Sequence, residues 1–352
     1  MKKRRISKQL HIGRVKIGGG APVAVQSMTK TDTRDAKATI AQIKKLERCG
    51  CEIIRVAIPD QEAAASLAKI KKSVSIPVVA DIHFDYRLAL AALKAGADGL
   101  RLNPGNIRDK EQVRKVVMAA KARDIPIRIG INSGSLPPGR PRGLSTADYM
   151  VEIAIQQVRL LEDWDYELIK IALKAFDVPT TIEAYRGIAG KTHYPLHIGI
   201  TEAGPPQTGI IRSAAGIGIL LYEGIGDTIR VSLSAPPQEE VIAAFGILRS
   251  LNLREHGPLL VSCPSCGRSE TDVVELALRV SKYLDKVTKP VKVAVMGCVV
   301  NGPGEAKDAD VGIACGKGRG ALFRKGKVIR TVKESEFFQS LTGEIESLVN
   351  QV

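Results

Sequence analysis

The sequence predicts an α/β fold, a (β/α)8 TIM-type barrel followed by a smaller α+β domain. From about residue 22 to residue 257, eight short β-branched runs alternate with segments of helical periodicity. Repeated strand–helix alternation implies a parallel sheet, and eight such units can close into a barrel. An open, doubly wound sheet is the alternative, but no Gly-x-Gly-x-x-Gly motif follows the first run, which favours the barrel. The pattern changes after a linker at 256–258, so we expect domains at 1–257 and 258–352.

Each expected barrel strand is a short run rich in Val, Ile and Leu. Helical stretches separate consecutive runs, most clearly at 36–47, 61–72 and 147–161. The eight strands are expected at 23–28, 52–57, 77–83, 99–103, 126–132, 166–171, 196–202 and 227–232.

The remaining segment, roughly 95 residues long, is large enough to pack as an independent domain. Its strands do not alternate regularly with helices, which indicates an α+β arrangement. We expect strands at 259–262, 291–296 and 311–314, a helix at 271–284, a hairpin turning at 324–327 and a final helix at about 334–349.

Charged and amide side chains recur toward the C-terminal ends of the barrel runs, where strands covered by helices should be apolar. Barrel enzymes build their sites at this face. Several arginines and a lysine at one mouth suit a multiply charged anion such as phosphate, whereas a carboxylate and an imidazole suit proton transfer. The candidates are Arg55, Asp81, His83, Arg101, Asn103, Arg128, Asn132, Lys170, Glu202, Arg230 and Ser232.

A cysteine constellation marks the second domain. Cys263 and Cys266 form a Cys-x-x-Cys pair after one expected strand, and Cys298 follows another. A redox dithiol is disfavoured because no thioredoxin-like unit surrounds the pair. A four-cysteine zinc site that adds Cys315 stays open. An iron–sulfur cluster is favoured by the spacing, and the Gly/Pro-rich turn after Cys298 would return Glu305 toward the cysteines as a carboxylate ligand.

Composition limits the class of protein and its partners. The chain is 44% hydrophobic and 25% charged, which is ordinary for a globular protein, and its net charge is +15. Such a charge suits an anionic partner, and a diphosphate substrate, an acidic electron donor and nucleic acid all satisfy it. The basic N-terminus is not followed by an apolar stretch, and no run of about eighteen apolar residues occurs. We therefore expect a soluble, cytoplasmic protein without disulfides.

Eight motifs carry a resemblance to a known family. They are VQSMT at 25–29, ADIHF at 80–84, RLNPGN at 101–106, IRIGIN at 127–132, GITEAG at 199–204, GIGDTIRVS at 224–232, CPSC at 263–266 and GCVVNGPGE at 297–305. In this order they resemble the 4-hydroxy-3-methylbut-2-enyl diphosphate synthases of the non-mevalonate isoprenoid pathway, in their short bacterial two-domain form.

The resemblance implies an oxidoreductase that opens the ring of 2-C-methyl-D-erythritol 2,4-cyclodiphosphate and eliminates water, using two electrons delivered through a 4Fe–4S cluster. It implies a homodimer that takes electrons from ferredoxin or flavodoxin. Glu202 corresponds to the family's acid/base group, with Asp81 and His83 in the same pocket. The implied cluster ligands are Cys263, Cys266, Cys298 and Glu305. The implied substrate ligands are Arg55, Arg101, Asn103, Arg128, Asn132, Lys170, Arg230 and Ser232.

Two rival functions stay open at this point. One is a nucleic-acid-binding protein whose basic C-terminal domain is stapled by a four-cysteine zinc site, which the cations between 317 and 327 favour. It leaves the charged groups at the barrel mouth without a purpose. The other is a barrel enzyme that acts on a phosphorylated pterin or sugar and holds a merely structural cluster.

Overall fold

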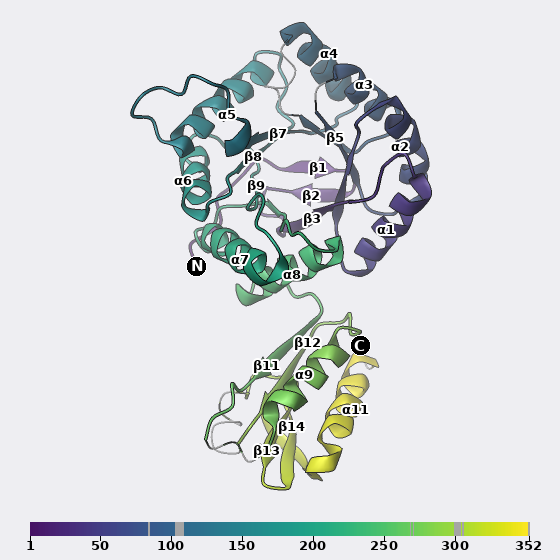
Figure 1. Ribbon diagram of the computed structural model, residues 1–352, viewed down its shortest axis with the longest axis vertical. Coiled ribbons are helices and arrows are strands. Elements are labelled where there is room, and N and C mark those ends of the chain that lie inside the picture. The colour runs from purple at the N-terminus through teal and green to yellow at the C-terminus, as the bar shows by residue number, and fades with distance from the viewer. Residues whose placement is uncertain are drawn as a thin grey trace. The chain divides into compact units, whose positions relative to one another are not determined.

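The computed structural model describes residues 1–352 except 84, 103–108, 268, 270, 299–303, 305, 351 and 352. It divides into two compact units, Met1–Arg254 and Glu255–Val352, each with its own sheet and core (Figure 1). The expected boundary at residue 257 falls just before the first strand of the second unit, which begins at Pro258. Among the described residues, no helix has the length and apolar character needed to cross a membrane.

The first unit is a barrel of eight parallel strands in the order β8-β7-β6-β5-β4-β3-β10-β9. A parallel bridge between Ile171 and Leu196, with a hydrogen bond from Ile171 N to Pro195 O of 2.9 Å, closes the ring. The TIM-type barrel prediction is therefore confirmed. The strands are β3 (Ala24–Met28), β4 (Ile53–Ala57), β5 (Val78–Ile82), β6 (Gly99–Leu102), β7 (Ile127–Asn132), β8 (Ile169–Lys174), β9 (His197–Ile198) and β10 (Thr228–Ile229).

The last three strands differ from the runs that predicted them. β8 begins and ends three residues later than expected, at Ile169 and Lys174. β9 and β10 are only two residues long each, so the polar C-terminal parts of both runs form loops. Glu202 has a φ of 52°, and a non-glycine residue in this left-handed region cannot continue an extended strand.

Eight long helices surround the strands of the barrel (Figure 1). Five of them begin after an aspartate whose side chain accepts a backbone N–H of the first turn, and α7 and α8 begin with proline. The helices are α1 (Ala36–Arg48), α2 (Gln61–Ser73), α3 (Tyr86–Lys94), α4 (Lys110–Lys121), α5 (Thr146–Glu162), α6 (Val178–Ala189), α7 (Pro206–Tyr222) and α8 (Pro237–Ser250), with a short 3-10 turn, η2 (Ser133–Ser135), after β7.

A hairpin that the sequence analysis did not anticipate closes one end of the barrel. β1 (Leu10–Ile12) pairs antiparallel with β2 (Val15–Ile17) and crosses the ring (Figure 1). Ile12 and Ile17 pack against Ala24, Ile53 and Val79, which lie in the N-terminal halves of their strands. This apolar floor seals the amino end of the barrel, so the polar residues of the interior can be approached only from the carboxyl end.

The second unit has a five-stranded sheet in the order β11-β12-β13-β14-β15, in which β11, β12 and β13 are parallel and the last two pairings are antiparallel. Two helices cover one face, where Leu276 and Leu341 pack against Val293. Ala294, Met296 and Phe323 form a smaller cluster apart from this core. The α+β prediction is confirmed. The elements are β11 (Pro258–Ser262), α9 (Val273–Leu284), β12 (Val291–Met296), β13 (Val311–Gly316), β14 (Arg319–Arg324), β15 (Lys327–Lys333), η3 (Glu334–Glu336) and α11 (Phe337–Asn350).

Candidate active site

The barrel interior gathers charged residues from neighbouring strands. In the register of the ladders, Asp81 of β5 pairs with Arg101 of β6, Arg101 with Arg128 of β7, and Arg128 with Lys170 of β8. Each of these four is less than a tenth exposed. The neighbours on either side along each strand belong to the apolar core beneath the helices, so alternation turns these charged side chains inward. The predicted convergence of charges is therefore present in the structure.

Asp81 is the centre of this cluster. Its Oδ1 accepts a hydrogen bond from Arg101 Nη1 at 3.1 Å, and its Oδ2 lies 3.5 Å from Arg55 Nε and 3.7 Å from His83 Nε2. Burial alone would raise the pKa of Asp81, but the positive charges of Arg55, Arg101 and Arg128 outweigh burial and lower it. Asp81 is therefore held as a carboxylate.

Positive charge exceeds negative charge in the interior. Burial, reinforced by neighbouring cations, lowers the pKa of Arg128, Lys170 and Lys174 well below their ordinary values. The Nε atoms of Arg101, Arg128 and Arg230 are buried and make no hydrogen bond with any residue that the structure describes. Unpartnered buried donors are costly. The arrangement therefore suits an anion that brings both charge and acceptor oxygens.

Lys170 lies near the floor of the barrel. Its Nζ is 3.5 Å from Gln26 Oε1, and both residues line a cavity of about 10 Å³ together with Ile12 of the floor. Lys174 follows four residues later on the same strand and the same side, roughly 13 Å nearer the carboxyl end. Lys174, which the site prediction did not include, is thus the lysine closer to the mouth.

A buried histidine orients Lys174. His197 Nε2 lies 3.4 Å from Lys174 Nζ, and His197 Nδ1 lies 2.7 Å from Thr228 Oγ1. Burial, followed by the charge of Lys174, lowers the pKa of His197 well below its ordinary value, so the ring stays neutral. A Cβ at Gly199 would lie 2.8 Å from Lys174 Nζ and would also clash with the backbone oxygen of Arg230, so glycine there leaves room for both.

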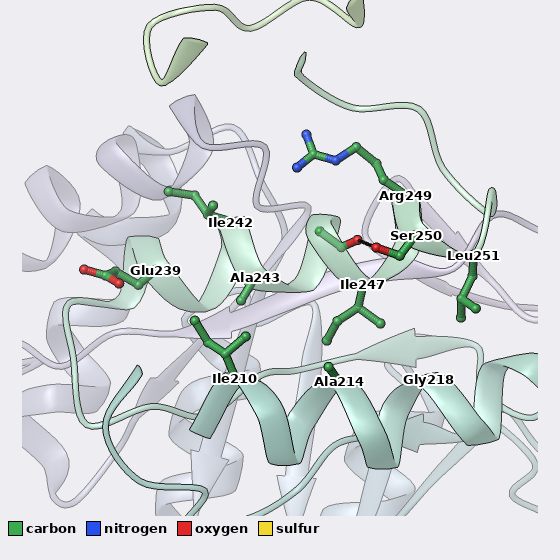
Figure 2. A pocket seen from close by; sticks show the side chains of 11 residues that line it. Ile210, Ala214, Gly218, Glu239, Ile242, Ala243, Ile247, Arg249, Ser250 and Leu251 are labelled. Carbon is green, nitrogen blue, oxygen red and sulfur yellow. Dashed lines mark hydrogen bonds between the residues drawn. The ribbon is translucent and has the colours of Figure 1, made fainter. Parts of the chain in front are cut away.

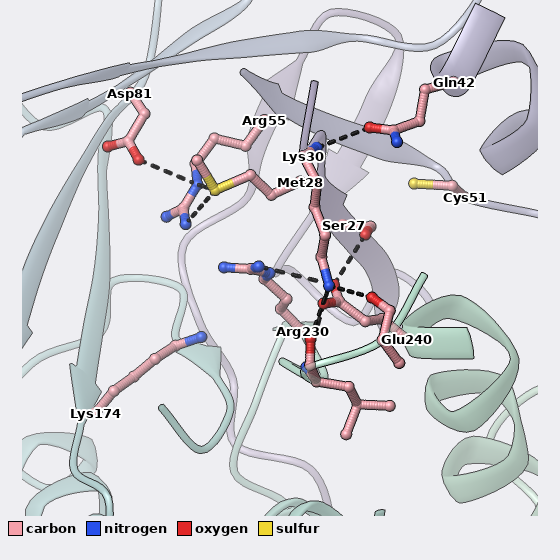
Figure 3. A network of polar contacts seen from close by, with 12 residues as sticks. Ser27, Met28, Lys30, Gln42, Cys51, Arg55, Asp81, Lys174, Arg230 and Glu240 are labelled. Carbon is pink, nitrogen blue, oxygen red and sulfur yellow. Dashed lines mark hydrogen bonds and ion pairs between the residues drawn. The ribbon is translucent and has the colours of Figure 1, made fainter. Parts of the chain in front are cut away.

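A second carboxylate organises the mouth near β3 and β10 (Figure 3). Glu240 of α8 is 2% exposed, and its Oε1 lies 3.1 Å from Lys30 Nζ. Its Oε2 accepts from Ser27 Oγ at 3.2 Å and lies 3.7 Å from Arg230 Nη2. In the same view Arg55 points toward Met28, whose Sδ accepts from Nη2 at 2.9 Å. Glu240 and Lys30 were also absent from the site prediction.

The other predicted residues lie around this cluster. Asn132 is the last residue of β7, and Ser232 follows β10; both are half-buried. Glu202 is exposed on the loop after β9, and among the described residues no hydrogen bond or ion pair joins it to the cluster. Asn103 lies outside the described residues. The structure thus brings Arg55, Asp81, His83 and Arg101 into direct contact but not Glu202.

The cysteine loops meet at one edge of the second sheet. Because β11, β12 and β13 are parallel, Cys263 after β11 and Cys298 after β12 leave the sheet at the same end. A Cβ at Gly297 would lie 3.2 Å from Cys263 Sγ, which places the two loops in close contact. The N–H of Ser265, whose φ is 63°, donates to Cys263 Sγ at 3.4 Å.

The thiols at this edge are available as ligands. None of the six cysteines is joined in a disulfide, and Cys263, Cys266 and Cys298 are all at least partly exposed. Within the described residues, no three His, Cys, Asp or Glu side chains gather closely enough to hold a metal ion, and Glu305 lies outside that part of the chain. Cys315 is fully buried in the core beneath the helices, and burial raises the pKa of its thiol to about 11.

A larger cavity than the one beside Lys170 lies elsewhere, between α7 and α8 on the outside of the barrel (Figure 2). It measures about 460 Å³ and is lined mainly by apolar side chains such as Ile210, Ile242 and Ile247. No set of titratable groups converges on it, because Glu239 and Arg249 lie toward different ends of α8. The charged interior of the barrel is therefore the better candidate for chemistry.

Solved structures of other proteins resemble about 70% of this chain. Dihydropteroate synthase from Stenotrophomonas maltophilia aligns with a TM-score of 0.53 at 14% identity and covers 70% of this chain and 97% of that one. A type I 3-dehydroquinate dehydratase from Clostridium difficile gives 0.52 at 15% identity, covering 70% and 98%. At such identities the likeness concerns the fold and says nothing of the reaction.

The sequence matches are far closer. A relative from Dehalococcoides mccartyi strain CBDB1, named 4-hydroxy-3-methylbut-2-en-1-yl diphosphate synthase (flavodoxin), is 64% identical over 345 residues, 98% of this chain and 99% of the relative. One of the same name from Thermodesulfovibrio yellowstonii is 56% identical over 347 residues, 98% and 99% of the two chains. The model of the GcpE TIM-barrel domain matches residues 7–245, and that of the GcpE protein C-terminal domain matches 259–347. These matches give the nucleic-acid alternative no support, and they show that the chain belongs to the GcpE family.

Proposed function

We propose that this protein catalyses the reaction for which its relatives are named: the two-electron ring opening and dehydration of 2-C-methyl-D-erythritol 2,4-cyclodiphosphate to 4-hydroxy-3-methylbut-2-enyl diphosphate. It is then an oxidoreductase of isoprenoid biosynthesis. The observation that carries the proposal is the excess of buried cations in the barrel, with three arginine Nε atoms that lack hydrogen-bond partners among the described residues.

A diphosphate would supply the negative charge and the hydrogen-bond acceptors that the barrel interior lacks. Its oxygens accept from several guanidinium N–H groups at once, and its charge offsets the repulsion among Arg101, Arg128 and Lys174. Arg55 and Arg230, held by Asp81 and Glu240, would flank the anion on the side of β3 and β4. We assign Asn103, Asn132, Lys170 and Ser232 to the same pocket from the family resemblance.

Proton transfer falls to groups at the carboxyl end of the strands. Asp81 stays ionised and is committed to Arg55 and Arg101, so it fits a positioning role. Glu202 is exposed on the loop after β9, where it can reach a substrate bound at the mouth. We assign to Glu202 the proton that lets the substrate hydroxyl leave as water, and His83 lies beside Asp81 as a second proton carrier.

The second unit fits a 4Fe–4S cluster. Three thiols that form no disulfide and are at least partly exposed lie on loops at one sheet edge. A backbone N–H donates to one of the sulfurs, a contact of the kind that tunes cluster thiolates. Cys263, Cys266 and Cys298 would hold the cluster, with Glu305 as the carboxylate ligand. Bound there, the cluster would supply the two electrons and an iron that lacks a thiolate ligand. Burial of Cys315 in the core favours three thiolate ligands over four.

The partners follow from the same proposal. The relatives' names specify flavodoxin, which we propose as the electron donor, with ferredoxin as the other protein of that kind expected from the resemblance. We further propose a cytoplasmic homodimer, because family members pair two chains so that a cluster domain reaches a barrel mouth.

Anaerobic purification followed by a turnover assay tests the function. The expected result is a brown protein that contains iron and labile sulfide and converts the cyclodiphosphate to the linear diphosphate when reduced flavodoxin is supplied. A colourless zinc protein that binds nucleic acid and leaves the cyclodiphosphate unchanged would overturn the proposal. In the active protein, Glu202→Gln should assemble the cluster normally but lose most of its turnover.

A further inference from the structure

The second unit carries a strip of positive charge that the catalytic roles above do not use. Seven Lys and Arg residues lie between residues 317 and 333, a segment without Asp or Glu; Glu334 follows it directly, and its N–H donates to Gly318 O at 3.2 Å. Arg324 is neutralised by Glu344, with Nη2 2.6 Å from the carboxylate. The other six are exposed: Lys317, Arg319, Lys325, Lys327, Arg330 and Lys333.

Five of the six exposed cations lie at the two ends of the β14–β15 hairpin, and Arg330 lies between them. Arg319 pairs with Lys333 across the strands at one end, next to Gly316, the last residue of β13. Lys325 and Lys327 lie at the other end, where the hairpin turns. Because β13 runs parallel to β11 and β12, the cysteine loops leave the sheet at the end that carries Arg319 and Lys333.

The register gives the distance between the cations and the cysteine loops. Met296, two residues before Cys298, pairs with Ala314, and Ala314 pairs with Ala321 of β14. Neighbouring strands are about 4.8 Å apart, so β14 and β15 lie roughly 10–15 Å from β12 at this level. A protein seated on Arg319 and Lys333 would therefore stand beside the cysteine loops.

The pair formed by Arg319 and Lys333 does not stabilise the fold. Arg319 and Lys333 are directly opposite each other, and like charges in that relation destabilise a sheet. Neither forms an ion pair with any carboxylate of the described residues. Lysines on an edge strand discourage pairing with other sheets, which accounts for Lys327 and Arg330 on β15. It does not account for Arg319, because β14 is an inner strand.

We propose that Arg319 and Lys333, with Lys317 in the turn between β13 and β14, form the docking surface for an acidic electron-donor protein of the flavodoxin class. The proposal rests on the function proposed above and adds the place where the donor binds. Carboxylates around the donor's flavin would meet the cations, which speeds encounter and makes the rate fall as salt rises. A transient contact of this kind also lets the donor leave after each electron.

The test is a charge reversal with a matched control in the same hairpin. The double variant Arg319→Glu/Lys333→Glu is compared with Lys325→Glu/Lys327→Glu, which changes the net charge by the same amount at the far end. Each protein is assayed with reduced flavodoxin and, separately, with dithionite, and flavodoxin binding is measured by titration of flavin fluorescence. We expect the first variant to lose roughly tenfold or more in kcat/KM for flavodoxin and in affinity. Its dithionite-driven turnover, and both activities of the control, should stay within about twofold of the wild type.

The outcomes separate the docking surface from the function. An equal loss of kcat/KM for flavodoxin in both double variants would mean that only net charge matters. Unchanged flavodoxin kinetics in the first variant would mean that the donor binds elsewhere. Either result overturns the proposal. So would self-association of the first variant with normal donor kinetics, because the cations would then serve only to protect the sheet. If the wild type binds flavodoxin but converts no cyclodiphosphate with either reductant, the proposed function fails while the binding titrations still decide the docking surface.

Discussion

Glu240 Oε1 lies 3.1 Å from Lys30 Nζ, so a carboxylate that is almost fully buried on α8 holds a lysine from the loop after β3. Its other oxygen faces Arg230, from the loop after β10, at 3.7 Å. Lys30 Nζ also donates to Leu233 O at 2.7 Å. One side chain from the outer helix layer thereby fixes two loops at the mouth of the barrel.

Replacing Glu240 with Gln tests this relationship. The amide oxygen can still accept from the backbone N–H of Leu233, and the NH2 group can donate to Ser27 Oγ, but the charge that Lys30 and Arg230 face is lost. We expect the free energy of unfolding to fall by about 1–2 kcal/mol, a modest loss because Lys30 is more than one-third exposed. KM for the cyclodiphosphate should rise more than kcat falls. Urea titration and steady-state kinetics measure both, with the exposed neighbour Glu239→Gln as control; equal effects of the two variants would contradict the role.

Replacing Asp81 with Asn removes the carboxylate between Arg55 and Arg101. Asp81 is 3% exposed, and breaking a buried ion pair by removing one partner leaves the other charge uncompensated. We expect a loss of about 3 kcal/mol in the free energy of unfolding at pH 7, measured by urea titration. Pyrophosphate, as a mimic of the substrate's anion, should recover part of this loss. A variant as stable as the wild type would show that the arginines do not depend on Asp81.

The difference in stability between the wild type and Asp81→Asn should depend on pH, in a direction that the pKa of Asp81 fixes. The pKa of Asp81 is lowered in the folded protein, so the unfolded chain binds this proton more tightly. The contribution of Asp81 is therefore complete above its unfolded pKa, about 3.9, and is lost as pH falls through the folded value. The stabilities of wild type and Asp81→Asn should converge below about pH 4. Curves that stay parallel from pH 7 to pH 3 would exclude this titration.

The barrel was predictable because its signal is periodic. The β-branched runs that predicted β3 to β7 are buried on both sides in the structure and so are apolar except where they enter the site. The β1–β2 hairpin was missed because strands of three residues are too short to show alternation. The sixth strand was predicted to end at Ile171, but β8 continues for three more residues. The last of them is Lys174, which the site prediction therefore missed.

The missed site residues differ in how far the sequence could have revealed them. Lys174 shares the period-two face of Lys170, so a strand extended to its true end would have included it. Glu240 gives no such signal, because a glutamate in the first turn of a helix is usually explained by the helix dipole. Only the packing of α8 against β3 shows that Glu240 points inward, toward Ser27 and Lys30.

The two buried lysines of β8 should respond differently to replacement by methionine. Both lysines are assigned to the substrate pocket, but Lys174 lies nearer the mouth, so Lys174→Met should weaken pyrophosphate binding and raise KM more than Lys170→Met does. Burial disfavours the charged form of Lys170, and its Nζ lies 3.5 Å from Gln26 Oε1, which is a long hydrogen bond. Lys170→Met should therefore leave the free energy of unfolding unchanged or raise it. Because its pKa is lowered by folding, wild type should gain stability relative to Lys170→Met as pH rises toward about 10.4. Denaturation from pH 7 to 10 and pyrophosphate titration measure these effects. If Lys170→Met weakened pyrophosphate binding more than Lys174→Met, the placement of Lys174 nearer the anion would be wrong.

Gly297 should be required for loading of the proposed cluster rather than for folding. A Cβ at this position would lie 3.0 Å from Ser269 Oγ and 3.2 Å from Cys263 Sγ, so alanine must push the loop of Cys298 away from that of Cys263. Gly267, directly after Cys266, has open space around the same added atom and is the matched control. We expect Gly297→Ala to hold less than half the iron and labile sulfide per chain of the wild type, and Gly267→Ala to match the wild type.

The second unit should keep its fold in both variants, because the Cβ added at Gly297 approaches only side-chain atoms, of Ser269, Cys263 and the core residue Val273, at 3.0–3.2 Å. Circular dichroism and thermal unfolding of the cluster-free proteins check this. Full loading of Gly297→Ala would show that the two loops do not need this close approach. Equal loss in both variants would mean that any bulk near the cysteines is harmful, and that the contact between Gly297 and Cys263 has no special part in holding the cluster.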